Sequence, residues 1–229
     1  AKSSPHIEIS RFGYADNGMP LHYIIFSEDQ NFNPFNAEEK NKNIVLINNA
    51  IHAGEPDGTD ACILLLKNLA TQKNLRDSLK NTVILIIPFY NLGGVLNRNS
   101  STRVNQNGPA EYGFRGSARN YDLNRDFIKA DAENTKAFYK LFHEWNPDIF
   151  IDNHVSNGAD YQYTLTYIAT QYQKLGVYAG PYLKNVLEPE IKADLSRKGI
   201  INSPYVNVFK TIPDSGFEMF LETPRYATG

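Results

Sequence analysis

Three continuous runs of apolar residues stand out along the chain, at residues 44–47, 83–87 and 149–151. None of them alternates with polar residues. Runs of this kind are typical of strands buried on both faces of a sheet that helices cover. We therefore expect the three segments to be buried strands of an α/β sheet.

Helical periodicity fills the intervals between these runs. Residues 58–72 predict one helix, and residues 130–145 predict a second that ends before Pro147, because proline cannot continue a helix. The order strand, helix, strand, helix, strand predicts an open, mostly parallel (mixed) sheet with helices on both faces. With no linker or internal repeat in the sequence, we expect residues 1–229 to form a single domain.

The remaining segments give weaker patterns. Residues 22–26 predict an early strand, and residues 217–221 predict a late one. Residues 90–126 are rich in Asn, Gly and Arg, so they predict an irregular loop, and loops of that length are usually functional. Residues 171–198 predict two shorter helices with a break at each of two prolines.

Composition excludes several function classes. The chain is 41% apolar and 21% charged, which is typical of a folded protein and not of a disordered one. Its net charge of −2 argues against the basic surface of a nucleic-acid-binding or membrane-surface protein. No stretch is long and apolar enough to predict a transmembrane segment. Cys62, the single cysteine, lies in an apolar run and is expected to be buried.

Candidate metal ligands follow two of the predicted strands. His52 and Glu55 come after the run at residues 44–47, and His154 comes after the run at residues 149–151. If these strands are parallel, all three side chains lie at the same edge of the sheet, where open α/β sheets bind ligands. Two imidazoles and one carboxylate with an open fourth position are typical of a catalytic zinc site, so we expect one Zn²⁺ per chain.

A second carboxylate lies at the end of the late predicted strand. Glu222 follows residues 217–221, at a place where it could take a proton from an activated water as general base. Taken alone, this strand is also compatible with a solvated charge at a strand end.

These motifs, together with residues 122–127, resemble the zinc carboxypeptidase family of carboxypeptidase A/B type. Residues 122–127 read Asp-Leu-Asn-Arg-Asp-Phe, similar to the family's Asp-x-Asn-Arg-Asn-Phe stretch. The order and approximate separations of the motifs are those of the family, and the resemblance covers roughly residues 44–225. It implies that His52, Glu55 and His154 bind zinc and that Glu222 is the general base.

The resemblance also implies roles for residues of the predicted loop. Asn124 and Arg125 would bind the terminal carboxylate of the substrate, a task that suits the fork of a guanidinium group. Arg103 would stabilise the tetrahedral oxyanion, with Arg98 and Arg115 as alternatives. Asp122 would orient a ligand imidazole, which we expect to be that of His52.

The chain departs from the family in two places. Many secreted members have Arg between the two zinc ligands, whereas this chain has Ala53 and Gly54, so one substrate contact is absent. The family's domain continues beyond the catalytic glutamate, but only residues 223–229 follow it here, so we expect a missing C-terminal part. The family also uses a mobile tyrosine, for which Tyr205 is the candidate.

The resemblance implies a zinc-dependent exopeptidase that removes a C-terminal amino acid from a peptide or acyl-amino-acid substrate with a free carboxylate. Two alternatives stay open. One is a related zinc amidohydrolase that acts on acyl-amino acids or on cell-wall or γ-linked peptides, and the other is a catalytically silent binding relative. The start at Ala1 suits a mature chain after signal cleavage, which predicts an exported protein, with the cytosol as the alternative.

Overall fold

The structure is a computed structural model. It describes residues 4–39, 41–103, 106, 108–156 and 162–205. Its contacts divide the chain into two compact units, residues 1–158 and residues 159–229. Among the described residues, no helix combines the length and the apolar character that crossing a membrane requires.

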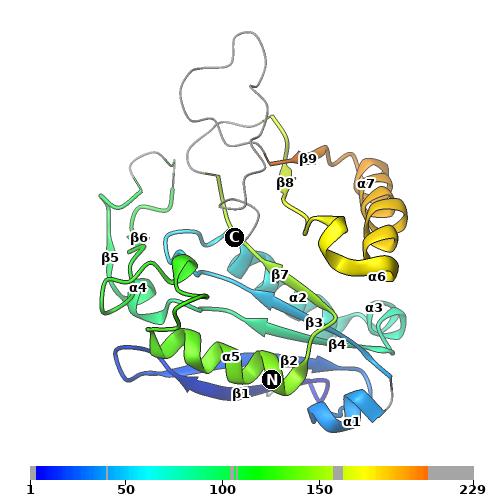
Figure 1. The fold of residues 1–229 in the computed structure, drawn as a ribbon, viewed down its shortest axis with the longest axis horizontal. Helices are drawn as coiled ribbons and strands as arrows, with labels where there is room; N and C mark the ends of the chain where they lie inside the picture. The colour runs from blue at the N-terminus through cyan, green and yellow to red at the C-terminus, as the bar shows by residue number, and fades with distance from the viewer. Residues whose placement is uncertain (1–3, 40, 104–105, 107, 157–161, 206–229) are drawn as a thin grey trace. The chain divides into compact units, whose positions relative to one another are not determined.

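A five-stranded mixed sheet forms the centre of the first unit (Figure 1). In spatial order its strands are β1 (Ile7–Tyr14), β2 (Pro20–Ser27), β4 (Thr82–Ile87), β3 (Asn43–Asn48) and β7 (Ile149–Asp152). The pairs β4–β3 and β3–β7 are parallel, whereas β1–β2 and β2–β4 are antiparallel. The three strands predicted from apolar runs and the early strand are therefore confirmed as strands. The expected burial on both faces holds for β3 and β4 but is wrong for β7, which is the last strand of the sheet among the described residues and whose Ile149, Phe150 and Ile151 are 40–41% exposed. The predicted strand at residues 217–221 lies outside the described residues.

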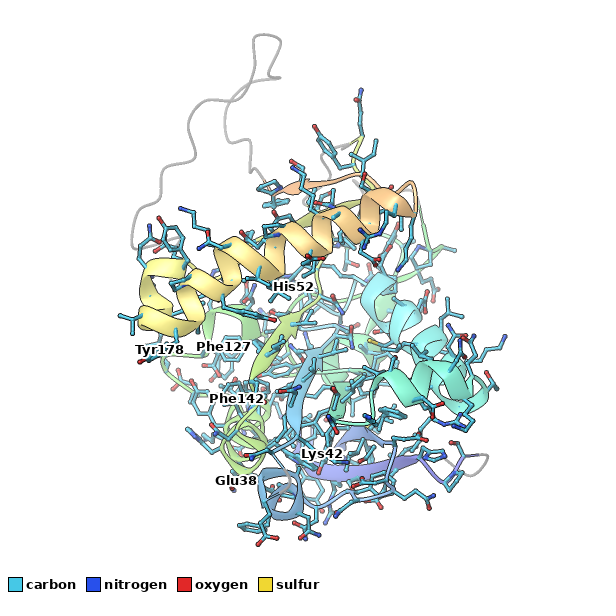
Figure 2. All side chains as sticks on the ribbon, turned by 90° about the vertical axis from the view of Figure 1, so that its right-hand side faces the viewer. Glu38, Lys42, His52, Phe127, Phe142 and Tyr178 are labelled. Carbon is cyan, nitrogen blue, oxygen red and sulfur yellow. The ribbon has the colours of Figure 1, made fainter. Side chains whose placement is uncertain are left out.

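Helices cover both faces of this sheet, as predicted. Neighbouring residues of β3 belong to different cores: Leu46 packs in the core of α5 (Glu133–Trp145), and Ile47 packs in the core of α2 (Asp57–Thr71). Phe142 of α5, labelled in Figure 2, packs against the first of these cores. The alternation follows from the strand period of two. Each fully buried aliphatic side chain stabilises the fold by about 2 kcal/mol.

The carboxyl ends of three strands meet at one edge of the sheet. Asn48, the last residue of β3, is in register with Ile87 of β4 on one side and with Asp152 of β7 on the other. The chain therefore leaves β3 and β7 at the same edge, and this geometry brings the segments after them together.

The long predicted loop is mostly irregular, with short elements in it. Between Tyr90 and Asp126 the described residues form α4 (Leu92–Leu96), β5 (Arg98–Asn99), β6 (Tyr112–Gly113) and a 3-10 turn (Leu123–Arg125). Two further short helices, α1 (Pro34–Glu39) and α3 (Lys73–Ser78), complete the first unit.

The second unit pairs two short strands beside one helical run. β8 (Leu165–Tyr167) is parallel to β9 (Asn202–Pro204). The run consists of a 3-10 turn (Tyr172–Leu175), α6 (Gly176–Tyr182), a π turn (Leu183–Leu187) and α7 (Glu188–Arg197).

The predicted break at each proline of this segment is wrong, because helical structure continues through Pro181 and Pro189. Pro189 lies in the first turn of α7, directly after the π turn. Where the backbone hydrogen bonds change from the π to the α pattern in this way, the missing N–H of proline costs little stability.

Candidate metal centre

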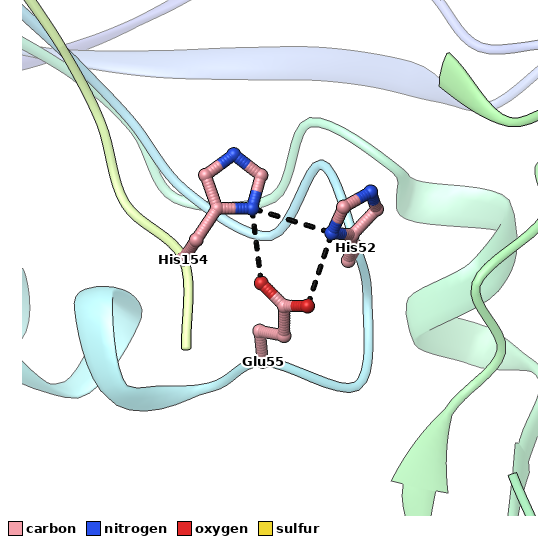
Figure 3. Close-up of side chains that lie close together, drawn as sticks. All are labelled: His52, Glu55 and His154. Carbon is pink, nitrogen blue, oxygen red and sulfur yellow. Dashed lines mark hydrogen bonds and ion pairs between the residues drawn. The ribbon is translucent and has the colours of Figure 1, made fainter. Parts of the chain in front are cut away.

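His52, Glu55 and His154 converge at the edge where β3 and β7 end (Figure 3). His52 Nδ1 lies 3.0 Å from Glu55 Oε1, His154 Nδ1 lies 3.1 Å from Glu55 Oε2, and the two Nδ1 atoms are 3.2 Å apart. One donor atom from each residue lies within 4.8 Å of the others. The structure thus brings together all three sequence-predicted metal ligands.

A tight turn brings two of these ligands together. The backbone N–H of Glu55 donates to the carbonyl of His52 at 3.0 Å, so the side chains three residues apart face the same point. The first turn of α2 then passes close to the end of β7: a Cβ on Gly58 would lie 2.4 Å from Cβ of Asn153 and 2.6 Å from Oδ1 of Asn49. Only glycine permits this approach without displacing the segment that leads to His154.

The outer nitrogen of each imidazole points at a different carboxylate. His154 Nε2 lies 2.9 Å from Asp152 Oδ2, within hydrogen-bond distance. His52 Nε2 is buried, has no hydrogen-bond partner among the described residues, and lies 3.7 Å from Asp122 Oδ1. The predicted neighbour of His52 is therefore in place, at a distance longer than a hydrogen bond.

Glu55 is the most enclosed member of the site, with 2% of its side chain exposed. Burial alone would raise the pKa of its carboxyl group. The hydrogen bonds from His154 and His52, with the charges of His52 and Arg103, outweigh burial and hold this pKa well below its usual value. The backbone N–H of Val155 also donates to Glu55, at 3.1 Å. Glu55 is therefore a carboxylate at neutral pH.

His154 responds to the same contacts in the opposite direction. Burial lowers the pKa of its imidazole, but the hydrogen bonds to Asp152 and Glu55 and their negative charges raise it from 6.5 to about 9. In the metal-free protein at neutral pH, the imidazole of His154 therefore carries a proton on each nitrogen.

Residues of the predicted loop take different positions around this centre. Arg103, with 11% of its side chain exposed, forms a direct ion pair with Glu55. Asp122 accepts a hydrogen bond from the backbone N–H of Asn124 at 3.1 Å and two from Arg115, at 3.0 and 3.1 Å. This arrangement places the carboxylate of Asp122 at the start of the 3-10 turn, with the fully buried Leu123 anchoring it.

The other predicted residues are less closely placed. Arg125 ends the 3-10 turn with an exposed side chain, and its guanidinium donates to the carbonyl of Asn124 at 2.9 Å. Tyr205 lies in the second unit, where its backbone N–H donates to the carbonyl of Tyr167. Glu222 lies outside the described residues. The roles of these residues stay predictions.

Asp152 and Asn48 are site residues that sequence reasoning missed. The signal was present: Asp152 precedes His154 by two residues at the end of a strand, a spacing that places two side chains on the same side. Asn48 could be found only from the strand register, because 104 residues separate it from Asp152.

A model of the zinc carboxypeptidase family matches residues 1–193 of the 229 residues. The chain belongs to this family. The family uses zinc, and the donor set fits that ion: two Nδ1 atoms and a carboxylate face one point, and both outer nitrogens face carboxylates.

Curated relatives in the family include two fungal carboxypeptidases. Carboxypeptidase 2 of Trichophyton rubrum is 29% identical over 137 residues, which is 59% of this chain and 22% of that protein. Carboxypeptidase 2 of Trichophyton tonsurans is 32% identical over 111 residues, or 48% of this chain and 18% of that protein. The chain thus spans about a fifth of the length of these relatives.

Solved zinc carboxypeptidases share the fold. The metallo-carboxypeptidase of Burkholderia cenocepacia superposes with a TM-score of 0.63 at 17% identity, over 88% of this chain and 49% of that one. The Pseudomonas aeruginosa enzyme, solved with (2-guanidinoethylmercapto)succinic acid, gives a TM-score of 0.64 at 14% identity, over 92% of this chain and 49% of that one. These structures support the predicted α/β fold class.

Proposed function

We propose that this protein is a zinc-dependent carboxypeptidase that hydrolyses the C-terminal peptide bond of its substrate. The observation that carries the proposal is the convergence of His52, Glu55 and His154 at one edge of the sheet, with their donor atoms facing one point. Membership of the zinc carboxypeptidase family supports it.

His52, Glu55 and His154 would hold the metal in this proposal. The zinc ion, when bound, supplies Lewis-acid chemistry that lowers the pKa of a water and polarises the scissile carbonyl. Glu222 takes the proton from the attacking water and later delivers it to the leaving amine. The proton that the water loses therefore ends on the leaving amine, and no other proton donor is needed.

Cationic residues of the loop bind the substrate. Arg103 stabilises the oxyanion of the tetrahedral state, and its ion pair with Glu55 supports a position next to the metal ligands. Arg125, whose guanidinium is exposed, binds the terminal carboxylate together with Asn124. Recognition of a free carboxylate restricts cleavage to the end of a peptide.

Elemental analysis of the purified protein beside a His154→Ala variant tests the metal site. About one zinc per chain, lost in the variant, is expected. Hydrolysis is then measured on a peptide, the same peptide with an amidated C-terminus, an acyl-amino acid and a γ-linked peptide. Cleavage of the free peptide but not of the amidated one supports a carboxypeptidase, and cleavage of only the acyl-amino acid or the γ-linked peptide would contradict it.

The proposed general base is tested separately. Glu222→Gln should retain zinc while turnover falls to background, because an amide cannot accept the proton. Hydrolysis at the wild-type rate by this variant would remove Glu222 from the mechanism.

A further inference from the structure

The carboxylate of Asp152 bridges two strands and one metal ligand. Its Oδ2 lies 2.9 Å from Nε2 of His154, and its Oδ1 accepts a hydrogen bond of 2.9 Å from the side-chain amide of Asn48. Asn48 is fully buried, and 21% of the Asp152 side chain is exposed. Both oxygens of Asp152 are therefore engaged by groups of known position.

The sheet itself fixes this carboxylate. Asn48 and Asp152 are the last residues of β3 and β7 and face each other in the parallel ladder. One step beyond, the backbone N–H of Asn153 donates to the carbonyl of Asn48 at 3.0 Å. The backbone pairing thus continues past the side chains, so the Asn48 amide holds Asp152 at a fixed distance from His154.

The position of Asp152 decides which nitrogen of His154 can bind a metal. A carboxylate at Nε2 keeps the proton on that nitrogen, since an ionised carboxylate accepts hydrogen bonds and donates none. When the imidazole is neutral, its lone pair then lies on Nδ1. That atom faces His52 Nδ1 and Glu55 Oε2, at 3.2 and 3.1 Å.

We propose that Asp152, held by Asn48, is a positioning residue of the metal centre that fixes His154 as an Nδ1 ligand. The inference rests on the proposed function, since it names how one ligand of the proposed zinc site is oriented. Carboxylate partners of ligand imidazoles typically change metal affinity 10- to 100-fold when they are removed.

Zinc affinity of variants, measured by competition with a chelator, tests this role. Asp152→Ala should weaken zinc binding about 10- to 100-fold, and the isosteric Asp152→Asn should weaken it less, because its amide oxygen can still accept the His154 proton. The matched control is Asp148→Asn at the opposite end of β7, where the Asp148 carboxylate accepts the backbone N–H of Ile44 at 2.7 Å. This control should lose stability but keep the zinc affinity of the wild type.

A spectroscopic readout separates positioning from a purely structural role. In the zinc-loaded protein, the Nε2 proton of His154 should resonate downfield and exchange slowly with water, because Asp152 accepts it. The signal should disappear in Asp152→Ala and persist in Asp148→Asn. If Asp152→Ala fails to fold, Asp152→Asn carries the same measurements, with the resonance expected at a shifted position.

The outcomes distinguish the two proposals. Wild-type zinc affinity together with an unchanged Nε2 resonance in Asp152→Ala would overturn the positioning role and leave the zinc carboxypeptidase proposal intact. Equal losses of affinity in Asp152→Ala and Asp148→Asn would also overturn it, since general destabilisation would then explain both. Absence of zinc from the reconstituted wild-type protein would overturn the proposed function, and the positioning role with it.

Discussion

The candidate metal ligands and the proposed substrate-binding residues lie in two regions that are built differently. The first region, which we call the strand ends, comprises His52, Glu55, Asp152 and His154. The second is the loop at residues 90–126. At the strand ends, side chains follow parallel strands whose register sets their spacing, and Glu55 is almost completely buried. In the loop, a 3-10 turn holds the proposed substrate-binding residues, of which Asn124 is half-buried and Arg125 is exposed.

The same difference applies to the outer partners of the two histidines. Asp152 lies on the strand that leads to His154 and is held by the neighbouring strand, at 2.9 Å from Nε2. Asp122 lies in the loop, is held by the 40%-exposed Arg115, and is 3.7 Å from Nε2 of His52. The sheet thus fixes the outer partner of His154, whereas the outer partner of His52 is held by a partly exposed loop residue.

The largest expected effects, on zinc affinity and on kcat/KM, come from replacing one side chain in each region by alanine. His52→Ala should weaken zinc binding about 100-fold, because the proposed site then loses one of its three protein ligands, and structural zinc sites bind with about 10–16 kcal/mol, or about 3 kcal/mol for each of four ligands. Arg125→Ala should leave zinc affinity unchanged and lower kcat/KM about 100-fold through the lost carboxylate contact. Chelator competition and steady-state kinetics measure the two quantities.

The two variants control each other. If Arg125→Ala also released zinc, the loop would be part of the metal site and the distinction between the regions would fail. An unchanged kcat/KM would instead remove Arg125 from carboxylate binding.

Arg103 is the loop residue that crosses into the strand-end region. Arg103→Ala should destabilise the metal-free protein by about 1.5–3 kcal/mol, because Glu55 loses a charged hydrogen-bond partner in a buried site. Urea unfolding gives this free energy. Arg98→Ala is a suitable control, because Arg98 is exposed and its guanidinium donates to the backbone carbonyl of Glu111 at 2.7 Å, the one hydrogen bond of its side chain among the described residues. Equal stability of the two variants would mean that the Arg103 ion pair contributes nothing.

A glycine-to-alanine substitution should destabilise the protein more beside the strand ends than in the loop, because the packing there is closer. Gly58→Ala places a methyl group where Cβ would lie 2.4 Å from Asn153, so the free energy of unfolding should fall by about 1–3 kcal/mol. Gly108→Ala in the loop places the added carbon more than 4 Å from the atoms of the described residues, so its effect should stay below about 0.5 kcal/mol. Thermal denaturation measures the stability of both variants. If Gly58→Ala were as stable as Gly108→Ala, the residues packed around Gly58 would accommodate a methyl group as readily as the loop does.

The sequence predicted the strand ends better than the loop for a physical reason. Continuous apolar runs identify strands, and the residue after a parallel strand has little freedom in where it lies, so His52 and His154 could be placed together. The position of Arg103 depends on how an irregular segment folds back over Glu55, which no periodicity encodes. Recognition of a family pattern identified it, and its contact with Glu55 came only from the structure.

The fold was predicted least well where local patterns are weak or misleading. β1 went unrecognised because polar Glu8, Ser10 and Arg11 interrupt its apolar residues, as suits an edge strand with one partner. The sequence predicts a break at Pro189, yet this proline lies in the first turn of a helix, where proline is tolerated. The Asn48–Asp152 contact depends on register, which no single segment reveals.

The pH dependence of zinc binding tests the contacts of His154 at the strand ends. His154 must lose a proton before Nδ1 can bind zinc, and its pKa is about 9 in the metal-free protein. Between pH 7 and 9, zinc affinity should therefore rise about tenfold per pH unit, with one proton from His154 released per zinc bound. Glu55 adds no slope in this range, because its pKa lies well below its usual value.

Calorimetric titrations in buffers with different ionisation enthalpies count the released proton. The sign for stability is opposite in the metal-free protein: a pKa raised from 6.5 to about 9 stabilises the fold fully below pH 6.5, and this stabilisation is lost as pH rises through 9. Metal-free protein should thus unfold at lower temperature at pH 9.5 than at pH 7, while the stabilisation that zinc gives grows from pH 7 to 9. Binding enthalpy independent of buffer would mean that His154 is already neutral at pH 7, and that its contacts with Asp152 and Glu55 are weaker than the strand-end geometry implies.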